Sequence, residues 1–460
     1  MTLREYTPYY KRILSLALPV ILSQAGQLTT QFADTAMVGH FGGDNPVPLA
    51  AVSLGSSLFL IIFLASLGLS LAITPMVGEH YARGDNHEVS RIFQNSILYC
   101  IIIGVVATIG AIALRPFIST LNGLMSSSGE AISEVTEMAL PYYDMLVWSL
   151  IPLMVFLAIK QFLEGIGNTK VAMWITLSGN ILNIALNYIF IFGECGCEAM
   201  GAEGAGLATL ISRLMQMVVM VGYLYMSKRL NTYRTLFARG NTALSYLRRL
   251  TAIGFPISFQ MVLESAAFIL TSILALSFGA EAAGAMQVTF NIANVAWMIT
   301  VAIGSASTIV VSHTYGAKER HKLRPTINAT YHLGIAWAMF MATLFITLRH
   351  FIAELFTSNV EIIELTSDLM LLIAIYQLSD AIQGLSISMM RGLQDVKVIM
   401  PIVTCSYLLL NIPVGTLLAY HFDMGCEGLV IGLIVGLSSA AILTAVRLRR
   451  QTRLFESGKI

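Results

Sequence analysis

Twelve long apolar stretches divide this chain, and they constrain its fold more than any other feature. A helix needs about 20 mostly apolar residues to cross a bilayer, whereas the strands of a membrane β-barrel are alternating segments of about 10. The stretches are continuous and longer than such strands, so the sequence predicts an all-α integral membrane protein with twelve transmembrane helices. The predicted spans are residues 13–38, 49–74, 92–114, 140–163, 171–192, 206–227, 251–276, 284–311, 326–348, 366–390, 398–420 and 428–447.

The composition is typical of a membrane protein. Of the 460 residues, 12% are charged and 56% are hydrophobic, whereas soluble proteins carry roughly 25% charged residues. A soluble globule with so few charges could not cover its surface. The composition therefore excludes a water-soluble enzyme, a disordered chain and a disulfide scaffold. The net charge of +1 gives no reason to expect a nucleic-acid partner.

The 27 basic residues predict the orientation of the spans. Of these, 23 lie in the two termini and in the loops that connect even-numbered to odd-numbered spans, and only Arg115 and Arg349 lie in the opposite loops. Because cytoplasmic loops carry the excess of Lys and Arg, we expect both termini in the cytoplasm. The first span is too long for a cleaved signal peptide, so we expect it to stay in the protein.

The two halves of the chain resemble each other, as in the match of Gly165–Lys170 with Gly392–Lys397. We expect an N-terminal six-helix lobe at residues 1–227, a basic cytoplasmic linker at 228–250 and a C-terminal six-helix lobe at 251–460. Because each lobe has an even number of spans, both lobes enter the membrane from the same side. The lobes are therefore expected to be related by a parallel pseudo-twofold axis. Such a repeat favours an alternating-access transporter over a channel.

Three acidic residues lie well inside predicted spans, where an ionisable side chain is costly and is therefore a candidate functional group. They are Asp34 in the first span, Glu264 in the seventh and Asp380 in the tenth. Two carboxylates that face one cavity would repel each other, which creates a site for H⁺ or for a cation such as Na⁺. Tyr376, one helical turn before Asp380, lies on the same face. The alternative is that each acid only hydrogen-bonds to a neighbouring helix. The sequence identifies no partner for Arg213 in the sixth span.

Polar amides add candidates for a substrate cavity. Asn180, Asn183 and Asn187 form one stripe on the fifth span, Gln24 lies on the first span and Gln287 opens the eighth. Such side chains either line a wet cavity or join neighbouring helices through hydrogen bonds. Both interpretations are kept for the Asn stripe.

Motifs of other functional classes are missing from the sequence. The chain has no Walker A sequence, so ATP is not the expected energy source, and it has no HExxH, GxSxG or CxxC motif. We therefore expect a protein that is not an enzyme, has no catalytic residues and needs no cofactor. A membrane-embedded enzyme or a channel is the alternative from another class. A disulfide among Cys195, Cys197 and Cys426 in the outer loops is an alternative to free thiols.

Several stretches together resemble one known family. These stretches are Gln31–Gly39 around Asp34, Leu182–Phe190, Gly254–Pro256 followed by Glu264, Met286–Val288, and Ala374–Gln383. On these motifs the chain is similar, over nearly its whole length, to the multidrug and toxic compound extrusion (MATE) family in its NorM-like bacterial branch.

This resemblance implies twelve helices in two lobes that form a V around a central cavity. It implies a monomeric antiporter of the bacterial inner membrane that extrudes cationic, often aromatic drugs in exchange for Na⁺ or H⁺. The cation site of this branch lies in the C-terminal lobe, where the matching positions are Glu264, Tyr376 and Asp380, with Na⁺ expected at Glu264 and Asp380. The matching acid of the other lobe, Asp34, is linked in the family to proton coupling or drug release. Export of a lipid-linked substrate, or of a single endogenous metabolite, is the alternative function.

Overall fold

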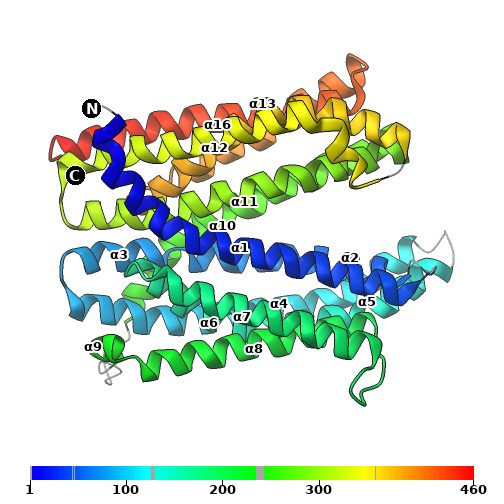
Figure 1. The fold of residues 1–460 in the computed structure, drawn as a ribbon, viewed down its shortest axis with the longest axis horizontal. Helices are drawn as coiled ribbons and strands as arrows, with labels where there is room; N and C mark the ends of the chain where they lie inside the picture. Colours follow the sequence, from blue (N-terminus) through cyan, green and yellow to red (C-terminus); the bar gives the residue numbers. More distant parts are fainter. Residues whose placement is uncertain are drawn as a thin grey trace. The chain divides into compact units, whose positions relative to one another are not determined.

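The computed structural model describes residues 3–43, 45, 47–125, 130–234, 243–357 and 359–459. Every regular element in these ranges is a helix (Figure 1). The elements are η1 (Leu3–Tyr6), α1 (Thr7–Gly42), α2 (Val47–Ser70), α3 (Ile73–Ala82), α4 (Asn86–Met125), α5 (Glu130–Trp148), α6 (Leu150–Gly165), α7 (Thr169–Phe192), α8 (Ala202–Met226), η3 (Lys228–Leu230), α9 (Asn231–Arg234), α10 (Leu244–Ala275), η4 (Leu276–Phe278), α11 (Ala280–Gly316), α12 (Arg320–Glu354), α13 (Val360–Gly392), α14 (Ile399–Thr404), η5 (Cys405–Asn411), α15 (Ile412–Thr416), η6 (Leu417–His421) and α16 (Gly425–Glu456).

Within the described residues, 12 helical spans are long and apolar enough to cross a membrane. Each predicted span overlaps one of them, so the all-α transmembrane class is confirmed. Some spans combine consecutive elements, such as α2 with α3 and α5 with α6. The spans are Arg4–Gly42, Val47–Ala82, Asn86–Pro116, Glu134–Gly165, Thr169–Phe192, Ala202–Met226, Leu244–Phe278, Ala280–Gly316, Arg320–Glu354, Val360–Gly392, Ile399–His421 and Gly425–Glu456.

The chain divides into two compact units. Unit 1 comprises Met1–Ile21 and Phe255–Ile460, and unit 2 comprises Leu22–Gly254. These units differ from the predicted lobes at the first and seventh spans, because α1 begins in unit 1 and α10 begins in unit 2. The predicted linker 228–250 falls in unit 2, and its residues 235–242 lie outside the described residues.

Polar contacts attach the first turns of α1 and α10 to their units. In unit 1, Tyr10 Oη of α1 and His332 Nδ1 of α12 are 2.7 Å apart. In unit 2, Tyr246 Oη of α10 donates a 2.6 Å hydrogen bond to Glu88 Oε1 of α4. Each unit is therefore completed by helical turns from the other half of the sequence.

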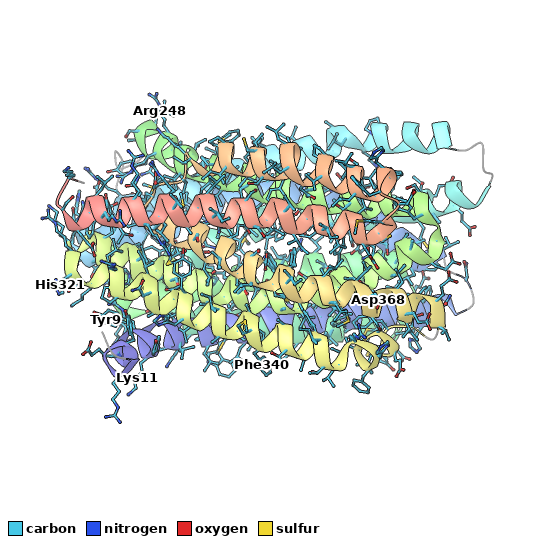
Figure 2. All side chains as sticks on the ribbon, turned by 90° about the horizontal axis from the view of Figure 1, so that it is seen from above. Tyr9, Lys11, Arg248, His321, Phe340 and Asp368 are labelled. Carbon is cyan, nitrogen blue, oxygen red and sulfur yellow. The ribbon has the colours of Figure 1, made fainter. Side chains whose placement is uncertain are left out.

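Unit 1 is organised around α13, which packs against α11, α12 and α16 (Figure 1). Charged side chains gather at the ends of this unit. Figure 2 shows Lys11 and His321 at one end and Asp368 toward the other, with the exposed Phe340 between them. Charged residues at the ends of the helices and apolar residues in their middle are the distribution expected for membrane spans, whose middle faces the lipid or the protein interior.

The eleventh span is not a regular α-helix. It runs through α14, the π-helix η5, α15 and the π-helix η6, and Pro413 in α15 lacks the N–H that an α-helical ladder needs. Glycines on α16 let this segment approach closely, as small residues do between membrane helices. A Cβ at Gly432 would overlap Cα of Gly415, and a Cβ at Gly436 would lie 2.6 Å from Cβ of Asn411. The tight packing holds η5 in place in unit 1.

Unit 2 has α8 next to α5, α6 and α7, and it has α4 next to α6 (Figure 1). Its interior includes the fully buried side chains of Phe93, Tyr143 and Phe162. The stacked rings of Phe93 and Phe162 have centroids 4.0 Å apart. This packing places the polar stripe of α7 beside α8.

Candidate functional site

Glu264 is the centre of a polar cluster in unit 1. Its Oε2 accepts a 2.7 Å hydrogen bond from Nε2 of Gln260, one turn earlier on α10. Its Oε1 accepts a 3.0 Å hydrogen bond from Oη of Tyr407 in η5. Nε2 of Gln383 on α13 donates to the same Tyr407 hydroxyl at 3.3 Å. The segments α10, α13 and η5 therefore meet at this carboxylate.

Asp380 lies on α13 beside these groups. Its side chain is only 2% exposed, and Oδ2 has no hydrogen-bond partner among the described residues. Glu264 acts on it electrostatically, and Tyr376, one turn earlier on α13, interacts with both acids. The structure thus brings together all three predicted residues of the C-terminal cation site. We call Glu264, Asp380, Tyr376, Gln260 and Tyr407 the acidic cluster.

A basic residue is linked to the acidic cluster. Nη2 of Arg391, near the end of α13, donates a 2.8 Å hydrogen bond to Oε1 of Gln260. Because Gln260 donates in turn to Glu264, two hydrogen bonds connect the guanidinium with the carboxylate, and the two charges also interact electrostatically. With Asp380 and Glu264 both ionised, the three charged groups carry a net charge of −1. One monovalent cation would bring them to neutrality.

Gln260, Gln383 and Tyr407 are not among the site residues predicted from the sequence. The two glutamines carry a usable signal, because Gln260 precedes Glu264 by four positions and Gln383 follows Asp380 by three, so each pair shares one helix face. Tyr407 carries no such signal. It lies on a different span, where the π-helical backbone departs from α-helical spacing.

The acidic cluster contains carboxylate, amide and phenol oxygens, a set of atoms that suits a hard cation or a proton. In the part of the chain that the structure describes, no group of three or more His, Cys, Asp and Glu side chains could hold a metal ion. The five cysteines are free thiols. The chemistry that this arrangement supports is reversible binding of a monovalent cation.

A second polar network lies in unit 2. Nδ2 of Asn187 on α7 donates to Oδ1 of Asp34 on α1 and, at 3.2 Å, to Oδ1 of Asn183. Nδ2 of Asn183 donates to Oγ1 of Thr209 on α8 at 3.4 Å. Asn187 is fully buried, and its Oδ1 has no partner among the described residues. We call Asp34, Asn187, Asn183 and Thr209 the amide network, which joins α1, α7 and α8.

Among the described residues, no hydrogen bond joins the other predicted cavity residues to these two groups. Asn180 belongs to the same stripe of α7, and a Cβ at Gly26 of α1 would lie 3.0 Å from its Nδ2, which has no partner in the described ranges. Gln24 is partly buried on α1, and Gln287 is exposed on α11. The roles of these three residues in a substrate cavity stay predictions.

Comparisons with known proteins agree with this arrangement. A family model described as MatE matches residues 19–189 and 256–417. The chain is 31% identical to the probable multidrug resistance protein NorM of Geobacillus kaustophilus, over 98% of this chain and 97% of that protein. It is 30% identical to the multidrug resistance protein MdtK of Edwardsiella ictaluri, over 97% of this chain and 96% of that protein.

Solved structures share the fold. A MOP superfamily transporter from Pyrococcus furiosus matches with a TM-score of 0.86 at 20% sequence identity, over 97% of each chain. A multidrug resistance MATE family transporter of the MOP superfamily, in an outward-facing conformation, also matches with a TM-score of 0.86 at 20% identity, over 98% of this chain and 97% of that one. The predicted twelve-helix architecture is therefore confirmed.

Proposed function

Because the chain belongs to the MatE family of membrane transporters, we propose that it is a multidrug efflux antiporter. In this proposal it exports cationic and aromatic compounds in exchange for Na⁺ or H⁺ by alternating access. The names of its relatives, multidrug resistance proteins NorM and MdtK, support the class of substrate. The acidic cluster supports the coupling to a cation, and it is the observation that carries the proposal.

The coupling ion is proposed to bind at the acidic cluster. Asp380 offers a buried carboxylate oxygen without a partner among the described residues, and Tyr376 adds a hydroxyl on the same helix face. Glu264 is held in place by Gln260 and Tyr407. A cation bound between the two carboxylates would remove their repulsion. An ion that binds one conformation better than the other shifts the protein toward that conformation, which is the basis of coupling.

The net charge of the acidic cluster with Arg391 supports one coupling ion per cycle. Exchange of one monovalent cation for one monovalent cationic drug moves no net charge, so the ion gradient alone would drive it. A tenfold ion gradient provides about 1.4 kcal/mol, which sustains a drug gradient of about tenfold. No nucleotide and no cofactor enter this scheme.

The amide network is proposed as a second functional site. Asp34 would contribute to proton coupling or to drug release from unit 2, supported by its hydrogen bond with the buried Asn187. A cationic drug would be attracted by this carboxylate, and this attraction would be lost after the carboxylate is neutralised. The residues proposed to line the substrate cavity are Gln24, Asn180, Asn183, Asn187 and Gln287.

We place the protein in the bacterial inner membrane as a monomer with both termini in the cytoplasm. The placement of the 23 basic residues in the termini and in loops of one parity supports this orientation. The relatives named NorM and MdtK, which are bacterial proteins, support the membrane.

Efflux from proteoliposomes under separately imposed Na⁺ and pH gradients tests the proposal. Glu264→Gln and Asp380→Asn are each expected to abolish cation-driven export of a lipophilic cation such as ethidium. Asp368→Asn is the matched control, because Asp368 lies on the same helix as Asp380 and its side chain is 61% exposed. Figure 2 shows the position of Asp368. If Glu264→Gln and Asp380→Asn both transport like the wild type, the assignment of the cation site to the acidic cluster is wrong. If neither gradient drives export by the wild type, antiport is wrong.

A further inference from the structure

Arg213 carries an intramembrane positive charge that the proposed coupling scheme does not use. It lies near the middle of α8, where a charged side chain is costly unless partners compensate it. Its Nη1 donates a 2.6 Å hydrogen bond to Oγ of the buried Ser149, and its Cζ lies 5.2 Å from the centroid of the Phe59 ring. Both partners are neutral, so they compensate the charge only in part.

The guanidinium makes its contacts with other residues of unit 2. Phe59 belongs to α2 and Ser149 lies between α5 and α6, so the side chain contacts residues from several helical segments of unit 2. Asp34 of α1 and Tyr142 of α5 also interact with it electrostatically. Residues of three helices, α1, α2 and α5, and of the junction between α5 and α6 therefore interact with Arg213.

No carboxylate forms an ion pair with Arg213 in the part of the chain that the structure describes. Asp34 acts on it over a longer distance, and Oδ1 of Asp34 is hydrogen-bonded to Asn187 instead. The bond to Ser149 is the only hydrogen bond that the Arg213 side chain makes with the described residues, and this side chain stays partly exposed. The guanidinium thus keeps N–H donors for a ligand.

The positions of the two charges suggest the kind of ligand. Thr209, one turn before Arg213 on α8, is part of the amide network that ends at Asp34. A guanidinium and a carboxylate therefore flank one polar network without neutralising each other directly. Arginine binds a carboxylate through two parallel hydrogen bonds, and an acid attracts an ammonium group. A compound that carries both groups complements this arrangement better than a simple cation does.

We propose that Arg213 is a carboxylate-binding residue of the substrate site and that unit 2 accepts zwitterionic compounds, with their carboxylate at Arg213 and their cationic group at Asp34. This assignment rests on the proposed export function, because it specifies one class of exported compound.

The test compares two fluorescent dyes that differ in a single group. A carboxyrhodamine is a zwitterion, and its methyl ester is a simple cation. Both dyes are expected to be exported from proteoliposomes by the wild type. Arg213→Gln is expected to lower export of the acid about ten- to hundredfold relative to the ester, the range for loss of a charge-assisted hydrogen bond. Arg213→Lys keeps the charge but cannot form the two parallel hydrogen bonds. Its export of the acid relative to the ester is expected to lie between the values for the wild type and for Arg213→Gln.

Arg115→Gln is the matched control, because this arginine of unit 2 is 49% exposed and pairs with Asp144. It is expected to leave the ratio of acid to ester export unchanged. Equal loss of both dyes in Arg213→Gln, or no change in their ratio, would overturn the assignment. Export of the ester but not of the acid by the wild type would also overturn it, independently of how any variant folds. Export of neither dye, nor of ethidium, would contradict the efflux function itself, and the assignment would fall with it.

Discussion

Replacement of Asp380 by Asn should make the cation-free protein more stable while it abolishes transport. The side chain is 2% exposed, and its Oδ2 has no partner among the described residues. A buried polar atom without a partner costs about 1–3 kcal/mol, and more when it is charged. The amide keeps nearly the same volume, removes the charge and ends the repulsion with Glu264. We therefore expect Asp380→Asn to raise the free energy of unfolding by about 1–3 kcal/mol, or Tm by about 2–10 °C.

Thermal unfolding of the purified protein in detergent measures this effect with and without the coupling cation. At a hundred times its Kd, a ligand stabilises the folded state by about 2.7 kcal/mol, and this increment should be present in the wild type and absent in Asp380→Asn. Asp368→Asn should behave like the wild type. The reasoning is refuted if Asp380→Asn unfolds at a lower temperature than the wild type without the cation. It is equally refuted if the cation stabilises both proteins by the same amount.

Three further substitutions test the surroundings of the acidic cluster. Arg391→Gln should lower the cation concentration for half-maximal efflux about tenfold, because it removes a positive charge that interacts with Glu264. At an effective dielectric constant of about 20, a unit charge at about 10 Å is worth about 1–2 kcal/mol. Arg447→Gln, whose guanidinium pairs with another carboxylate of unit 1, should leave that concentration unchanged. Tyr407→Phe removes the hydroxyl that donates to Glu264 and accepts from the buried Gln383. It should lower the free energy of unfolding by about 1–3 kcal/mol, measured by thermal unfolding, and an unchanged Tm would contradict this role of the hydroxyl. Gly432→Ala should destabilise unit 1 by about 1–3 kcal/mol in the same assay, because its Cβ would overlap the backbone of the eleventh span. Gly222→Ala, where a Cβ meets no atom within 4 Å, is the control and should be neutral or slightly stabilising.

The transmembrane architecture could be predicted from the sequence because the bilayer imposes local rules. Each span must be apolar over about 20 residues and must satisfy its own backbone hydrogen bonds, so each leaves a continuous signal in the chain. Contacts within one helix are equally local. Lys160 and Glu164, four positions apart, form an ion pair at 3.9 Å, and the same spacing places Tyr376 beside Asp380.

Contacts between distant segments carried no such signal. Tyr407 reaches Glu264 across 143 positions of the chain, from a π-helix that no apolar pattern predicts. Arg213 donates a hydrogen bond to Ser149, which lies 64 positions away in the chain, so the partner of Arg213 could not be predicted from the sequence. The sequence also did not predict that α1 and α10 each begin in one unit and continue in the other. Periodicity identifies the polar face of a helix, but the helix that this face meets depends on how all side chains of a unit pack together.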